Sequence, residues 1–373
     1  MRSVGTGARV SWRAIVLLGT AAFLGGEVLA RWLVAAEPAF SYQFLSSTLY
    51  ESDSTGAVRH IPNTEFRIVF VHNDAVEYDE RYHVNNLGFV DDRDYPTLPA
   101  SVPARRYAFV GDAFVAGIGA DPWVPRLRER LQAAGQLVDM YSLGVGGSSV
   151  QHFATLLRSA GRELKLTDLV LMPGSNNFLR PHWVPVVTGS EIRFCRPDGI
   201  ETCLARRRPF LMAGFDEPRE RILNRTRELT AQATADTAPV PMWKRVARHS
   251  VFAREARDGA RRLYRAWRPA PYDPFDMEDA RELPQSLNAL AAIRAEFPGL
   301  PIHLVHFPQK DEIASGRYNL DIGQRVEGLG INYFPALSSC TWTRDMYFPN
   351  DGHPSARGYE NMSGCVARYL SLE

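Results

Sequence analysis

The sequence predicts an α/β protein whose parallel sheet is covered by helices on both faces. From Arg106 onward, short apolar runs alternate with amphipathic segments of helical period, which is the pattern of βαβ units. The 373 residues are 45% hydrophobic and 23% charged, as in ordinary globular proteins. The formal net charge of +1 leaves no global basic field, so nucleic-acid binding is not expected.

The N-terminal region, residues 1–36, predicts a cytoplasmic tail and a single membrane span. Ala14–Ala36 contains only two charged residues, and as a helix it would be ~34 Å long, enough to cross a bilayer. Three arginines precede it, so the positive-inside rule places the N-terminus in the cytoplasm and the main domain on the periplasmic or extracellular side of the inner membrane. The alternative is a signal peptide cleaved after Val34-Ala35-Ala36.

The two charged residues of the span are Glu27 and Arg31, one helical turn apart. A charged pair inside a membrane rarely faces lipid, so one interpretation is a helix packed against integral-membrane partners. The other is a lone tilted helix in which Glu27 is paired or protonated and Arg31 reaches the interface.

Residues 37–104 predict a small strand-containing preamble. They are rich in Ser, Asp, Asn and Pro and contain short β-like runs such as Phe66–Val71.

Residues 105–373 contain the alternating pattern. The expected strands are Tyr107–Val110, Leu137–Tyr141, Leu169–Met172, Ile302–Phe307 and Asn332–Phe334. The expected helices cover about 122–134, 150–163, 285–297, 317–328 and 355–370.

The third and fourth strands are too far apart for one crossover, so residues 179–284 are expected to be a helical insertion with helices near 217–234 and 242–267. Between Ala205 and Arg268 there are 16 Arg or Lys against 7 Asp or Glu, a net charge of +9. Such a basic insertion suggests contact with anionic lipid or an acidic protein, and the alternative is a solvated helical face.

The four cysteines, Cys195, Cys203, Cys340 and Cys365, fit an oxidising compartment. Three pairings are possible, and the local pairs 195–203 and 340–365 are favoured over four buried free thiols. The sequence contains no Cys-x-x-Cys, so a zinc ribbon or a c-type haem is not indicated.

Four short motifs follow the predicted strands. They are Gly111-Asp112-Ala113, Gly144-Val145-Gly146-Gly147, Gly174-Ser175-Asn176-Asn177 and Asn350-Asp351-Gly352-His353-Pro354. In this order they resemble the blocks of the SGNH (GDSL-like) hydrolases. The resemblance implies a three-layer, flavodoxin-like fold over about residues 105–373, with no cofactor.

The resemblance also implies a role for each motif. Position 113 matches the serine nucleophile, His353 its base, Asp351 the carboxylate that orients the base, and Gly147 and Asn176 the oxyanion-hole donors. The chemistry needs these types because a serine hydroxyl is a poor nucleophile until an imidazole takes its proton. Hydrogen-bond donors must then meet the developing oxyanion.

The sequence departs from the family at the nucleophile, because position 113 is alanine. Loss of such a serine costs about a millionfold in turnover, and the nearby serines at 142, 148, 149 and 175 are poor substitutes. Ser142 stands where the family often has asparagine, and Asn177 where it has aspartate. These changes suggest a site that has lost supporting interactions, so Ala113→Ser is expected to restore little activity.

Three interpretations of Ala113 follow. The favoured one is a pseudo-hydrolase that serves as an accessory or structural subunit of a membrane complex. The second is an esterase or O-acetyltransferase acting on envelope polysaccharide or other acyl esters, in which Ala113 is an engineered or variant residue. The third is catalysis through His353 and water.

The preamble adds a weaker resemblance. His60-Ile61-Pro62-Asn63 and Asn86-Leu87-Gly88-Phe89-Val90-Asp91 are similar to the segment that precedes the SGNH domain in membrane-anchored bacterial envelope proteins, where position 90 is usually arginine. The alternative is an ordinary β-hairpin.

Overall fold

The structure is a computed structural model that describes residues 25, 40–46, 50–96, 105–189, 191–206, 211–235 and 280–372. It divides into a large unit, 41–226 with 274–373, and a second unit, 1–40 with 227–273. The expected anchor, with Glu27 and Arg31, and the expected helix near 242–267 lie outside the described residues. Among the helices that are described, none is long and apolar enough to cross a membrane.

The large unit is built on a five-stranded sheet of β6 (Arg105–Gly111), β7 (Val138–Gly144), β8 (Asp168–Met172), β12 (Ile302–His306) and β13 (Asn332–Pro335). All neighbouring strands are parallel, in the order β13-β12-β8-β6-β7. This is the flavodoxin-like order 2-1-3-4-5. The prediction of an α/β fold with a parallel sheet is confirmed.

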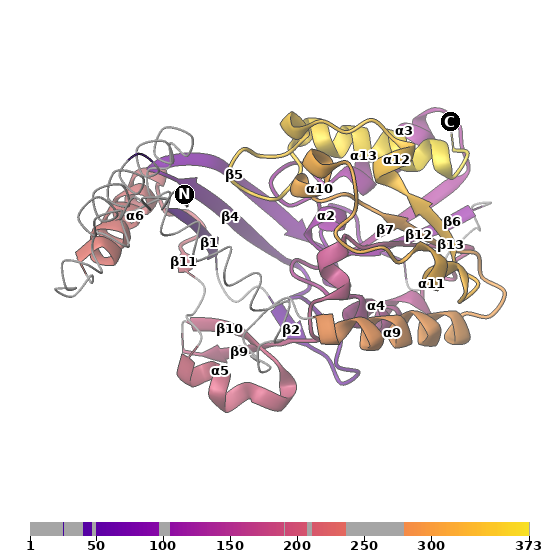
Figure 1. Cartoon of the computed structure of the whole chain (residues 1–373), viewed down its shortest axis with the longest axis horizontal. Helices are drawn as coiled ribbons and strands as arrows, with labels where there is room; N and C mark the ends of the chain where they lie inside the picture. Colours follow the sequence, from indigo (N-terminus) through magenta and orange to yellow (C-terminus); the bar gives the residue numbers. More distant parts are fainter. Residues whose placement is uncertain are drawn as a thin grey trace, which may run out of the picture. The chain divides into compact units, whose positions relative to one another are not determined.

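Helices cover both faces of this sheet, which makes three layers (Figure 1). On one face, Tyr107 and Phe109 of β6 belong to the same core cluster as α3 (Trp123–Ala133) and α13 (Ala356–Tyr369). On the other face, the alternate β6 residues Ala108 and Val110 cluster with residues of α4 (Val150–Leu156) and α9 (Leu283–Glu296). Because both faces of the strand are buried, it appears in the sequence as one continuous apolar run.

Most predicted boundaries differ from the structure by one or two residues, and two of the differences have a clear physical reason. Leu137, the predicted first residue of a strand, precedes β7 and is 72% exposed. The helix expected at 317–328 is shorter in the structure, where it is α11 (Gly323–Glu327). The residues before it form hydrogen bonds to α10 (Lys310–Ser315) instead of helical ones. The Asn319 N–H donates to the buried carboxylate of Glu312 in α10.

A second sheet combines the expected preamble with the expected insertion. β4 (Thr64–His72) pairs with β5 (Ala75–Val84) and with β1 (Ser41–Ser46), and β11 (Leu211–Ala213) pairs with β1 in parallel. A buried ion pair stabilises this arrangement: Arg67 donates to both carboxylate oxygens of Asp79 and to two carbonyls in the segment that follows β11. No sequence pattern predicted this pairing across the chain.

The remaining elements complete the described fold. They are β2 (Tyr50–Ser52), β3 (Val58–His60), α2 (Ala113–Ala116), η1 (Leu157–Gly161), η2 (Ser175–Phe178), β9 (Val184–Thr188), β10 (Glu191–Cys195), η3 (Pro197–Gly199), α5 (Ile200–Arg206), α6 (Arg219–Ala235), η4 (Ala280–Glu282), α12 (Ala336–Ser339) and η5 (Arg344–Met346). α6 confirms the insertion helix expected near 217–234. The expectation of a purely helical insertion is wrong, because β9, β10 and β11 also lie within residues 179–284 and pair in sheets.

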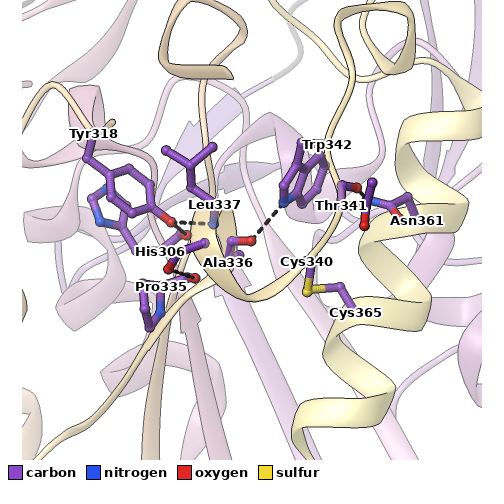
Figure 2. The surroundings of a disulfide bond; sticks show 11 residues. His306, Tyr318, Pro335, Ala336, Leu337, Cys340, Thr341, Trp342, Asn361 and Cys365 are labelled. Carbon is purple, nitrogen blue, oxygen red and sulfur yellow. Dashed lines mark hydrogen bonds between the residues drawn. A yellow bond between two sulfur atoms is a disulfide. The ribbon is translucent and has the colours of Figure 1, made fainter. Parts of the chain in front are cut away.

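Both favoured disulfides are present, and the alternative of free thiols is wrong. Cys195, in β10, is bonded to Cys203 in α5, with their Cα atoms 5.7 Å apart. Figure 2 shows the second bond, which joins Cys340 at the end of α12 to Cys365 of α13, with 6.0 Å between the Cα atoms. This second bond attaches α13 to the segment that follows β13.

Candidate active site

The candidate site lies where three strands of the main sheet end together. Gly111 of β6 is in register with Gly144 of β7 and Met172 of β8. The strand order reverses between β6 and β8, and in open α/β sheets ligands bind at the carboxyl ends of the strands at such a point. A cleft of about 390 Å³ opens here. It is lined by all five residues expected at the site: Ala113, Gly147, Asn176, Asp351 and His353.

Ala113 is the first residue of α2, directly after β6. The Asp112 carboxylate caps this short helix by accepting a hydrogen bond from the Phe114 N–H at 3.0 Å. Gly144 of β7 allows α2 to pack closely against this strand, since a Cβ at position 144 would lie 2.3 Å from the Ala116 nitrogen. The methyl group of Ala113, which is 6% exposed, therefore forms part of the cleft wall.

His353 and Asp351 form a hydrogen-bonded pair, with Nδ1 of His353 2.6 Å from Oδ2 of Asp351. Tyr78 of β5 donates its hydroxyl hydrogen to the same carboxylate oxygen at 2.8 Å, and the Gly352 N–H donates to the other. Burial by itself would raise the pKa of Asp351, but these three bonds outweigh it and lower the pKa. Nε2 of His353 has no hydrogen-bond partner within the described part of the chain.

The two expected oxyanion donors lie on the loops after β7 and β8. Gly147 has a φ of +77°, a left-handed conformation that favours glycine. Its carbonyl accepts a 2.9 Å hydrogen bond from the Trp183 indole, which holds the loop. Asn176 is half-buried in the cleft, and its amide makes no hydrogen bond to any other described residue. The amide is thus available to a ligand.

Asn177 and Ser142 were expected to have lost the hydrogen bonds that support the site, but both side chains make such bonds. The Asn177 amide donates to Asp112 Oδ2 at 2.8 Å and to the Ser148 carbonyl at 2.6 Å, and its Oδ1 accepts from the Gly174 N–H at 2.7 Å. Ser142 donates to the Val115 carbonyl at 3.2 Å. Both side chains are buried and hydrogen-bonded, so the reason for expecting little rescue by Ala113→Ser does not hold.

Ser148, Ser149 and Ser175, the other serines near position 113, are not positioned to act as nucleophiles, because all three are buried. The Ser175 hydroxyl donates to Glu312 and lies 3.1 Å from Nε2 of His306. Ser149 bonds to Nδ1 of His152 at 2.9 Å. Burial lowers the pKa of each of these histidines to about 3, so both are neutral structural groups at neutral pH.

Several cleft residues were not anticipated from the sequence. Arg180 lines the cleft beside Asp112, and Gln309 lines it at the start of α10. The second sheet contributes Gln43, Leu45 and Ile68, β2 contributes Tyr50, and the β9–β10 hairpin contributes Phe194. The only sequence signal for Arg180 was its position four residues after Asn176, in the segment that follows a predicted strand. No sequence signal could have found the apolar residues of the cleft, because long-range strand pairing brings them there.

The two preamble motifs contact each other and the main domain. The His60 N–H donates to the Gly88 carbonyl at 3.1 Å, and the His60 ring stacks on Phe66. Asp91 accepts two hydrogen bonds, at 2.6 and 3.0 Å, from the buried guanidinium of Arg128 in α3. These contacts hold the preamble against the domain that carries the site.

Among the described residues, no group of three or more His, Cys, Asp or Glu could hold a metal ion.

Comparison with family models gave no match, and neither did comparison with curated proteins. Solved structures gave distant similarities. The lipase/acylhydrolase from Enterococcus faecalis is 12% identical, with 71% of this chain and 95% of that chain covered and a TM-score of 0.36. A catalytic mutant of the Geobacillus stearothermophilus acetylxylan esterase Axe2 is 12% identical, with 74% and 98% covered and a TM-score of 0.37. A Clostridium thermocellum family 3 carbohydrate esterase is 11% identical, with 72% and 96% covered and a TM-score of 0.36. We draw nothing about chemistry from similarities this low.

Proposed function

We propose that this chain is a catalytically impaired SGNH-type protein that binds an ester ligand without cleaving it. The observation that carries the proposal is the methyl group of Ala113 in a cleft that also contains the hydrogen-bonded Asp351–His353 pair. The base and the candidate oxyanion donors surround a position with no hydroxyl. Acyl transfer to the protein is therefore absent, while the groups that would recognise an ester remain.

A second candidate is an active esterase or O-acetyltransferase in which Ala113 is a variant residue. The hydrogen bonds around Asn177 and Ser142 favour it, because they leave the surroundings of position 113 ordered. Water activated by His353 would be a third route. It would lack the covalent intermediate that divides one difficult step into two easier ones.

We also propose that the protein acts as an accessory subunit of a membrane assembly. In this proposal Ala14–Ala36 anchors the chain in the inner membrane, the main domain lies on the periplasmic or extracellular side, and Glu27 and Arg31 contact integral-membrane partners. The net charge of +9 between Ala205 and Arg268 supports contact with anionic lipid or an acidic protein.

A serine-directed fluorophosphonate probe and an ester-hydrolysis assay test the catalytic part. The wild-type chain should neither react with the probe nor hydrolyse the ester. Ala113→Ser should gain both activities, recovering part of the about millionfold that such a serine contributes. The double variant Ala113→Ser/His353→Ala is the matched control and should lose them again. Ester cleavage by the wild type that depends on His353 would overturn the proposal.

Gentle detergent extraction of the full chain, followed by size analysis, tests the accessory role. Co-migration with integral-membrane proteins is expected, and Glu27→Leu should weaken it. A clean monomer would contradict the accessory role and leave the cleft chemistry untouched.

A further inference from the structure

Arg180 is a charged residue of the cleft that the motifs do not account for. It lines the same cleft as Ala113 and His353, and its side chain is only 19% exposed. Its guanidinium forms an ion pair with the Asp112 carboxylate, with Nη1 3.5 Å from Oδ2, and makes no hydrogen bond within the described part of the chain. A guanidinium carries five N–H donors, and leaving them unused in a partly desolvated site is costly.

The carboxylates around the cleft are already occupied by other partners. Asp112 accepts hydrogen bonds from the Phe114 N–H and the Asn177 amide. Asp351 accepts from His353, from Tyr78 and from the Gly352 N–H. Asp351 forms no ion pair or hydrogen bond with Arg180 among the described residues, and Asp112 pairs with it through Nη1 at 3.5 Å. The other donors of the Arg180 guanidinium are therefore available to an anion.

We propose that Arg180 binds an anionic group of the ligand, a carboxylate or a phosphate-type group, and that it sets the ligand specificity of this cleft. The inference rests on the proposed function, because it takes this cleft as the ligand site. The planar guanidinium fork can form two parallel hydrogen bonds with such a group, which a single ammonium cannot do. The free amide of Asn176 would meet the ester oxygen of the same ligand.

A second cavity beside the cleft carries further cationic side chains. This cavity of about 600 Å³ shares Gln309 and Gly352 with the cleft and is lined by Lys310 and Arg344. Its one carboxylate, that of Asp311, accepts a hydrogen bond from Asn319. Lys310 already donates to the Phe348 and Pro349 carbonyls. A larger ligand that leaves the cleft along this side would therefore meet the charge of Lys310 and the guanidinium of Arg344.

Binding can be measured directly on the full-length wild-type chain in detergent, because Ala113 is not expected to cleave the probes. Three small esters of similar size separate the possibilities: monophenyl succinate carries a carboxylate, phenyl methyl succinate is neutral, and phenyl 3-phosphonopropanoate carries a phosphonate. Calorimetry should show at least one charged ester binding about 10- to 100-fold tighter than the neutral one. The stronger of the two charged esters identifies the anion.

Arg180→Gln should remove this preference by lowering the affinity for the charged ester about 10- to 100-fold, to near that for the neutral ester. Arg180→Lys keeps the charge without the fork and should retain part of the preference. Arg126→Gln, which changes an exposed arginine paired with Asp121 outside the cleft, is the matched control and should behave as wild type. Thermal melting of each variant shows that it is folded.

Equal affinity for charged and neutral esters, a preference that survives Arg180→Gln, or no binding of any of the three would overturn the inference. If the wild type cleaves the esters, the proposed function fails. The ratio of kcat/KM for charged and neutral esters then tests Arg180 separately.

Discussion

Asn177 donates a hydrogen bond to Asp112 across the ends of two neighbouring parallel strands, with Nδ2 2.8 Å from Oδ2. The same amide donates to the Ser148 carbonyl on the loop after β7. One side chain thus connects the loops that follow β6, β7 and β8, which together form the wall of the cleft. An aspartate at this position could not donate these bonds in its ionised form.

Asn177→Asp should therefore destabilise the protein, because two carboxylates would face each other at a buried site. One of them should keep a proton, which raises its pKa in the folded state above the unfolded value of about 3.9. The loss of stability should then grow as pH rises above about 4 and become small in acid. Thermal denaturation between pH 4 and 8 measures this trend. Asn332→Asp, at an exposed position of β13, is the control. Equal melting of both variants at all pH values would argue against the carboxylate contact.

Asp351→Asn should lower the free energy of unfolding at pH 7 by about 1–3 kcal/mol, since a charged hydrogen-bond acceptor is lost. The pKa of Asp351 is lowered in the folded state, so the carboxylate stabilises the fold above about pH 4 and ceases to do so as pH falls through the lowered pKa. The difference between variant and wild type should thus disappear in acid. Urea denaturation across this range tests the expectation. Asp92→Asn, at an exposed position, should show no such trend.

Tyr78→Phe should move the acid unfolding of the protein to higher pH. The Tyr78 hydroxyl is one of the groups that lower the pKa of Asp351, so removing it brings that pKa back toward the ordinary value. Stability at pH 7 should fall by about 1 kcal/mol. Tyr369→Phe, which removes a hydroxyl bonded to His303 away from the cleft, should leave the acid midpoint unchanged. An unchanged midpoint for Tyr78→Phe would mean that the hydroxyl does not act on Asp351.

Removal of the Cys340–Cys365 disulfide should cost more stability than removal of Cys195–Cys203. The bonds close loops with sequence separations of 25 and 8 residues, and the loop-closure entropy of the unfolded chain grows with loop length. The expected losses are about 3.5 and about 2.5 kcal/mol. Double Cys→Ser variants measured by urea denaturation provide the comparison. A larger loss for the shorter loop would show that packing at Cys195 and Cys203 dominates over chain entropy.

Local patterns in the sequence were enough to predict the five strands of the main sheet, to within three residues at each end. β6, β7, β8 and β12 are recognisable because most of their side chains are buried on both faces, which makes most positions apolar whatever lies further along the chain. β13, at the edge of the sheet, is less buried and is recognisable from its Tyr-Phe pair. The disulfide pairs were also predictable, since chain closure is easiest between nearby cysteines. The positions of Ala113, Gly147 and Asn176 in the cleft followed from the same local signals, because parallel strands end at a common edge.

The tertiary structure alone decided what surrounds Ala113. The pairing of Phe44 with Leu211, which brings β11 to β1, joins segments far apart in the chain. The bond from Tyr78 to Asp351 likewise joins two segments separated by most of the chain. Neither contact leaves a local pattern, because a strand has the same alternation whichever partner it pairs with. Arg180 and Asn177 were visible as residues, but only the packed strand ends show what their donors contact. The Arg180 guanidinium pairs with Asp112 through Nη1, whereas the Asn177 amide donates both to Asp112 and to the Ser148 carbonyl.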